Sequence, residues 1–153
     1  MRRLLNLSYR LQKSLWRLLK PRTRGVKVML FNAAGEIVLI RNTYGDSRLF
    51  VLPGGGIRPW EKPEAAAARE VREELGCRVK DMEFVATHHS ANEGKRDTIC
   101  LYRADLLGEP APDNFEVAEA RFFDLGALPA AISPATLRRI EEMQGKRPTS
   151  RDW

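Results

Sequence analysis

Several features are scarce in this chain of 153 residues, and each scarcity narrows the classes of protein it can belong to. Two cysteines, Cys77 and Cys100, lie in apolar sequence with no metal-ligand spacing, so we expect reduced core thiols in a cytoplasmic protein. The two histidines, His88 and His89, are adjacent in a predicted strand, where neighbouring side chains point to opposite faces and cannot share one site. No apolar run reaches the length of a membrane-spanning helix.

Acidic residues are absent from the first 24 positions, although the rest of the chain is close to neutral. This leader contains eight basic residues and accounts for the formal net charge of +6: Arg2, Arg3, Arg10, Lys13, Arg17, Lys20, Arg22 and Arg24. Residues 2–20 have leucines at helical spacing and predict a basic amphipathic helix. Three interpretations stay open: packing on its own domain or a second subunit, contact with an anionic membrane surface, or binding of nucleic acid, which we disfavour.

The remaining chain predicts alternating strands and two helices within a single domain. Proline at position 21 should end the leader helix, and we expect a hinge over 21–25. Predicted strands cover 26–32, 37–41, 49–52, 78–89, 98–107 and 120–125, and predicted helices cover 63–75 and 133–143. This order indicates an α+β fold with a mixed sheet between helices. The expected division is a leader (1–24), a catalytic domain (25–145) and a loose C-terminal tail (146–153).

The segment 54–77, GGGIRPWEKPEAAAAREVREELGC, is the most informative part of the sequence. Three glycines allow close backbone approach, and the following helix places Glu70, Glu73 and Glu74 at i, i+3 and i+4. Three carboxylates on one helical face repel each other unless a cation lies among them. Mg²⁺ prefers oxygen ligands that leave room for phosphate oxygens, so the segment predicts a carboxylate metal site.

The same segment resembles the Nudix box, the signature of the Nudix hydrolases. That pattern is Gly, five residues, Glu, seven residues, Arg-Glu, an apolar residue, any residue, Glu-Glu, any residue, Gly and an apolar residue. All of its fixed identities are present: Gly55, Glu61, Arg69, Glu70, Glu73, Glu74 and Gly76. The only soft departure is Cys77, where an aliphatic residue is usual. The resemblance implies the Nudix α/β/α sandwich.

The resemblance also implies roles for individual residues. Glu73 and Glu74 would bind Mg²⁺ or Mn²⁺ directly, with the backbone carbonyl of Gly54. Glu70 would bind the ion through water or act as the base that takes a proton from the attacking water. Arg69 would orient the carboxylates, and Glu61 would form a structural ion pair with a box arginine.

Residues other than the fixed identities of the box complete the predicted site. Glu116, shortly before the strand at 120–125, is our first choice for an additional metal carboxylate, and Glu93 is the second. Arg41, Arg58 and Arg96 are candidates for binding substrate phosphates. Three aromatic residues near the glycines are candidates for stacking on a base: Tyr44, Phe50 and Trp60.

The resemblance implies metal-dependent hydrolysis of a pyrophosphate bond in a nucleoside diphosphate linked to another moiety. The expected partner is a small-molecule nucleotide or nucleotide sugar, and the leucine stripe makes a homodimer plausible. Markers that separate the Nudix subgroups after the box are absent here, so the sequence does not identify the substrate. A nucleotide- or RNA-binding module without turnover is the alternative, but such modules typically lose box glutamates.

Overall fold

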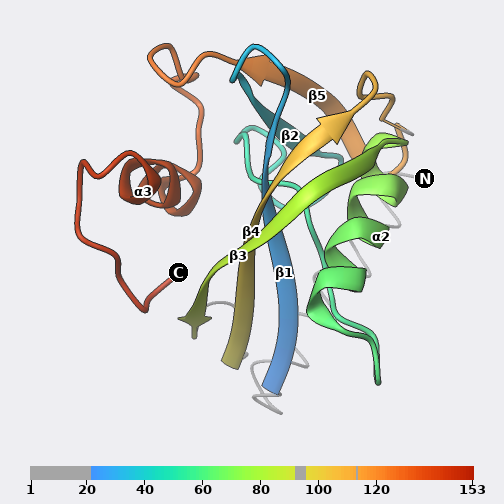
Figure 1. Ribbon diagram of the computed structural model, residues 1–153, viewed down its shortest axis with the longest axis vertical. Coiled ribbons are helices and arrows are strands. Elements are labelled where there is room, and N and C mark those ends of the chain that lie inside the picture. The colour runs from blue at the N-terminus through green and yellow to red at the C-terminus, as the bar shows by residue number, and fades with distance from the viewer. Residues whose placement is uncertain (1–21, 92–95, 113) are drawn as a thin grey trace.

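The computed structural model describes residues 22–91, 96–112 and 114–153, so the predicted leader helix and Glu93 lie outside the described residues. A five-stranded sheet with the order β3-β4-β1-β2-β5 forms the centre of the molecule (Figure 1). Its strands are β1 (Arg22–Phe31), β2 (Ile37–Asn42), β3 (Arg78–Ser90), β4 (Arg96–Leu107) and β5 (Val117–Phe123). β1 and β4 are parallel and the other neighbours are antiparallel, so the sheet is mixed as predicted.

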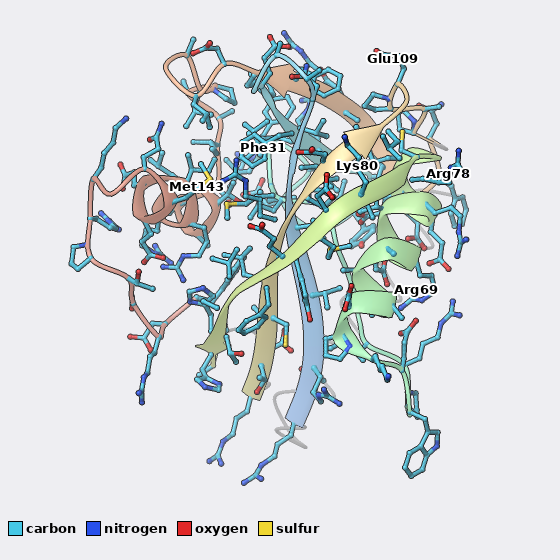
Figure 2. The ribbon with its side chains drawn as sticks, viewed as in Figure 1. Phe31, Arg69, Arg78, Lys80, Glu109 and Met143 are labelled. Atoms are coloured by element: carbon cyan, nitrogen blue, oxygen red, sulfur yellow. The ribbon has the colours of Figure 1, made fainter. Side chains whose placement is uncertain are left out.

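Two helices cover opposite faces of this sheet: α2 (Pro63–Leu75) and α3 (Pro134–Met143) (Figure 1). Alternation along β1 divides the core, because Val28 belongs to the cluster under α2 while Met29 belongs to the cluster under α3. Figure 2 shows Phe31 toward α3, away from Arg69 on α2. The α/β/α sandwich is therefore confirmed.

Both helices begin and end as the sequence predicts. Pro63 begins α2, where its missing N–H is not needed, and Gly76 ends it with a left-handed φ of 67°. Ser133 caps α3 by accepting a hydrogen bond from the backbone N–H of Thr136, at 3.2 Å.

The glycine loop lies in a gap between β1 and β2. These strands register only at Phe31 and Ile37, beside their turn, and then separate. The segment after residue 50 fills the gap: the N–H of Val28 donates to the Pro53 carbonyl at 3.0 Å, and the N–H of Val26 to the Gly55 carbonyl at 2.9 Å. The strand predicted over 49–52 forms only isolated bridges, between Val51 and Ile40 and between Phe50 and Ile132.

Two element predictions were wrong at the edges of the domain. The hinge expected over 21–25 is not a hinge in its described part, because β1 already begins at Arg22 and pairs with β4 from there. β5 begins at Val117, three residues before the predicted start, and ends at Phe123. The residues added to β1 are mostly polar, and those added to β5 include the buried Val117; in both places backbone pairing with a neighbouring strand decides the boundary.

The C-terminal segment, predicted as a loose tail, instead packs on α3 and the end of β3. The N–H of His89 donates to the Arg151 carbonyl at 2.7 Å, and the N–H of Trp153 donates to the His89 carbonyl at 2.9 Å. The guanidinium of Arg139, fully buried in α3, donates to the Asp152 carbonyl at 2.7 Å. Across the described residues, no helix combines the length and apolarity needed to cross a membrane.

Candidate active site

Two adjacent glycines set the shape of the loop for different reasons. Gly54 has φ +129°, and a Cβ there would lie 2.3 Å from the backbone oxygen of Val26 in β1. At Gly55 a Cβ would lie 2.6 Å from Oε2 of Glu70. Gly54 therefore permits the loop to approach β1, and Gly55 makes room for the Glu70 carboxylate.

Arg69 is the central donor of the site, and all five of its N–H groups are used. Nε and Nη2 bind both oxygens of Glu61 at 2.8 and 2.9 Å. Nη1 binds Glu70 at 2.7 Å and Glu73 at 3.0 Å, and Nη2 also binds the Gly56 carbonyl at 2.8 Å. This hydrogen bonding lowers the pKa of Glu61 to about 2. The structure thus shows the predicted ion pair of Glu61 with a box arginine, and the planar guanidinium fixes two further carboxylates.

Glu73 is the most accessible of the three box carboxylates on the helix, with 48% of its side chain exposed. Its Oε1 accepts from Nη2 of Arg58 at 3.0 Å, and its Oε2 accepts from Arg69. Arg58, a predicted substrate-binding residue, thus lies on the exposed side of the cluster of glutamates and forms an ion pair with Glu73.

Glu74 is the most deeply buried of these carboxylates, with 7% of the residue exposed. Its Oε2 accepts a hydrogen bond of 2.8 Å from the backbone N–H of Gly54. Burial is the main cause that raises the pKa of Glu74 to about 7; Lys27 and the Gly54 N–H oppose this shift, and the charges of Glu70 and Glu116 add to it. Glu74 is therefore a buried carboxylate that shares its surroundings with Glu70, Glu116 and Lys27.

Glu116 reaches this region from the segment before β5. The hydroxyl and N–H of Thr43, just after β2, donate to the carbonyls of Phe115 at 2.5 Å and Glu116 at 2.9 Å. Tyr44 follows directly, and burial raises its pKa to about 12, with further contributions from Glu116, Glu74 and other carboxylate charge. The structure thus brings Glu116 close to the box, and its binding of a metal ion stays a prediction.

Lys27 is the residue of the site that the sequence reasoning missed. Its Nζ donates to the carbonyls of Leu52 at 2.9 Å and Gly54 at 2.8 Å. The sequence offered one signal for it: Lys27 is the single charged residue of the strand segment Val26–Phe31 and lies on the same face as the buried Met29. Which carbonyls it would meet depends on the loop, which periodicity does not place.

The other predicted arginines lie in different surroundings. Arg41 on β2 forms an ion pair with Glu119, its opposite neighbour on β5, and its guanidinium lies over the Phe50 ring at 5.3 Å. Arg96 begins β4 opposite Arg22, at the sheet end that leads to the Gly25–Gly56 bridge. Arg41 thus faces β5, whereas Arg96 lies at the start of β4, three residues before Ile99, the partner of Gly25.

The remaining aromatic and sulfur residues divide between core and surface. Phe50 is 6% exposed and packs in the core, and Trp60 is fully exposed, so only Tyr44 lies among the carboxylates. Cys77 is buried and Cys100 half-buried, both as free thiols. His88 is buried while its neighbour faces solvent, which confirms that the two histidines do not share a site.

The donor chemistry fits a hard divalent cation, although within the described residues no three Asp, Glu, His or Cys side chains already converge on one ion position. Glu73 is directed to its two arginines, whereas Glu70, Glu74 and Glu116 concentrate carboxylate charge in one partly buried region. Such oxygen donors suit Mg²⁺ or Mn²⁺. The Gly54 carbonyl, predicted as a ligand, already accepts the Lys27 ammonium.

Comparison with known proteins agrees with this geometry. The family model for the NUDIX domain matches residues 21–143. A Bacillus subtilis (strain 168) protein, provisionally named an 8-oxo-dGTP diphosphatase, is 28% identical over 123 residues, which are 80% of each chain. The NAD-capped RNA hydrolase NudC of Pseudomonas aeruginosa (strain LESB58) is 26% identical over 78% of this chain, which spans 42% of that relative's length.

Among solved structures, the MutT NUDIX hydrolase from Burkholderia pseudomallei superposes with a TM-score of 0.70. It is 26% identical, and the match covers 78% of this chain and 96% of that one. The chain belongs to the Nudix family. It is a Nudix hydrolase, an enzyme that acts on pyrophosphate bonds.

Proposed function

We propose that this protein uses Mg²⁺ or Mn²⁺ to hydrolyse the pyrophosphate bond of a nucleoside diphosphate linked to another moiety. The observation that carries the proposal is the arrangement around Arg69, which fixes Glu70 and Glu73 while Glu74 and Glu116 lie nearby. An acidic helix that only faced water would not place its carboxylates around one buried guanidinium. A structural role for the box would also leave the concentration of charge near Glu74 unexplained.

The residues then have separate tasks. Glu73, Glu74 and Glu116, together with the Gly54 carbonyl, would hold the ion. Glu70, with one oxygen bound to Arg69 and the other against Gly55, would accept a proton from the attacking water. Arg58, on the exposed side of Glu73, would turn to a substrate phosphate once Glu73 binds the ion. When bound, the divalent ion supplies charge neutralisation at the phosphates and lowers the pKa of water.

The substrate we propose is a small nucleotide rather than an RNA chain. The relatives named above act on 8-oxo-dGTP, by provisional name, and on NAD-capped RNA, so a nucleotide diphosphate is their common chemistry. Tyr44 lies beside the carboxylates and offers one aromatic face near the reacting phosphates. Arg96, at the start of β4, would bind a more distant phosphate.

The test is a panel of dNTPs, ADP-ribose, nucleotide sugars and dinucleoside polyphosphates, each incubated with Mg²⁺, with Mn²⁺ and with chelator. The decisive variant is Glu73→Gln, and Glu64→Gln is its matched control, because Glu64 is an exposed glutamate in the first turn of the same helix. We expect Glu73→Gln to lower kcat by at least about 100-fold and Glu64→Gln to change it less than about twofold.

Two results would contradict the proposal. One is metal-independent turnover, and the other is full activity in Glu73→Gln. Tight nucleotide binding with no release of phosphate from any member of the panel would instead favour the binding module without turnover.

A further inference from the structure

Lys27 occupies an unusual position for a lysine in the centre of a sheet. It lies between the buried residues Val26 and Val28, is itself half-buried, and its ammonium binds two carbonyls of the loop. The carbonyls of Pro53 and Gly55 face β1 and accept hydrogen bonds from the backbone N–H groups of Val28 and Val26. The alternate carbonyls, at positions 52 and 54, face the other way, and these are the two that Lys27 binds at 2.9 and 2.8 Å.

The ammonium therefore does what no backbone group of β1 can do. It satisfies two loop carbonyls that a strand-like contact leaves unpaired, and it does so beside a buried carboxylate. Glu74 accepts from the N–H of Gly54, the same residue whose carbonyl binds Lys27. Lys27, Gly54 and Glu74 thus form one continuous chain of polar contacts, and the charge of the lysine also acts on the most buried carboxylate.

We propose that Lys27 is a positioning residue that acts as a tethered counter-ion: it binds the Gly54 carbonyl in the metal-free enzyme and releases it when a divalent ion binds. This inference rests on the proposed metal site. An ammonium and a divalent ion cannot share one carbonyl oxygen at contact distance without strong repulsion. Metal binding at this oxygen is then an exchange of one cation for another, and Lys27 weakens it while it stabilises the metal-free loop.

The test measures Mn²⁺ binding to the full chain without substrate, by calorimetry and by the electron paramagnetic resonance signal of free Mn²⁺. The variants are Lys27→Met, which removes the charge and the donors, and Lys27→Arg, which keeps both. Lys146→Met is the matched control, because it removes the same charge from an exposed position after α3. Thermal unfolding with chelator and with Mn²⁺ gives a second readout that does not depend on activity.

We expect Lys27→Met to bind Mn²⁺ at least tenfold more tightly than wild type and to unfold at a lower temperature in chelator. Its gain in Tm on adding Mn²⁺ should exceed that of wild type, Lys27→Arg and Lys146→Met. If Lys27→Met does not fold, Lys27→Gln removes the charge, keeps an N–H donor and is measured instead.

Unchanged or weaker Mn²⁺ binding in a folded, neutral variant would overturn the inference and leave the proposed function intact. Wild-type protein that binds no Mn²⁺ would contradict the proposed function itself, and the inference with it. The two failures are therefore distinguishable in one set of measurements.

Discussion

Alanine substitution at each of the three consecutive glycines of the loop should have three different effects, because each Cβ would meet a different neighbour. At Gly54 the Cβ would lie 2.3 Å from the Val26 backbone oxygen, with φ +129°. The atoms in contact belong to the backbone of β1, so neither the strand nor the loop can move without a large energetic cost. A strained backbone angle and an overpacked contact together cost about 2–5 kcal/mol. At about 2–4 °C per kcal/mol for a chain of this size, Gly54→Ala should lower Tm by roughly 4–20 °C.

Gly55→Ala should damage activity more than stability. Its Cβ would lie 2.6–2.7 Å from the carboxylate of Glu70, the far end of a flexible side chain that can move aside. Moving it breaks the 2.7 Å bond to Arg69, which costs about 1–3 kcal/mol because a charged pair is involved. Displacing the proposed base by about 1 Å should reduce kcat by roughly 100-fold.

Gly56→Ala is the internal control, since a Cβ there meets nothing within 4 Å and the φ is not positive. Its stability should be unchanged or higher by up to about 1 kcal/mol, because alanine restricts the unfolded chain. The measurements are Tm by calorimetry and kcat on the best substrate of the panel. Normal kcat in Gly55→Ala would refute the placement of Glu70 as the base, and a loss in Gly56→Ala equal to that in Gly54→Ala would refute the close-approach argument.

Two further predictions concern the C-terminal packing. Burial and the Arg139 guanidinium hold the pKa of His88 below its usual value, so the unfolded chain binds more protons and the free energy of unfolding should fall as pH drops below about 6.5. Denaturant unfolding at pH 7.5 and 5.5 should show a smaller loss of stability in His88→Asn than in wild type, and the wild-type loss in the exposed control His89→Asn. The wild-type loss in both variants would contradict this prediction. Removing residues 150–153 strips Arg139 of an acceptor and β3 of two backbone bonds, so it should cost about 2–4 kcal/mol, and a change below about 0.5 kcal/mol would show that the tail packs without stabilising.

The sequence predicted those parts of the fold whose local pattern and tertiary role coincide. α2 is an example: Pro63 and Gly76 mark its ends, and the same helix spacing that places the glutamates also buries Val71 under the sheet. The start of β1 shows the opposite case. Arg22–Phe31 pairs with β4 along its whole length, yet its first residues are polar and lack alternation. Only the neighbouring strand makes them part of the sheet.

The C-terminal tail and Lys27 escaped prediction for a related reason. The tail is ordered by Arg139 and His88, two residues 51 positions apart that meet only after α3 packs. Lys27 is visible in sequence as one charge on an apolar face, but its partners are backbone carbonyls, which every residue has. Sequence patterns predict which side chains are buried. They do not report which main-chain oxygens a loop will present.

The charges of the site suggest why a chain with so many clustered glutamates folds before it meets a metal. Arg69 neutralises part of Glu70 and Glu73, Arg58 neutralises the exposed side of Glu73, and Lys27 opposes the charge around Glu74. Buried like charges without partners would cost several kcal/mol each, so these cations are needed for the metal-free fold. Of the three, Arg69 directs four of its five N–H groups to Glu61, Gly56 and Glu70, which would not hold the proposed ion, whereas Arg58 and Lys27 bind atoms that the ion would need. Metal binding should therefore free two cations at once, one toward the open side of the site and one beneath the loop, while the central guanidinium stays fixed.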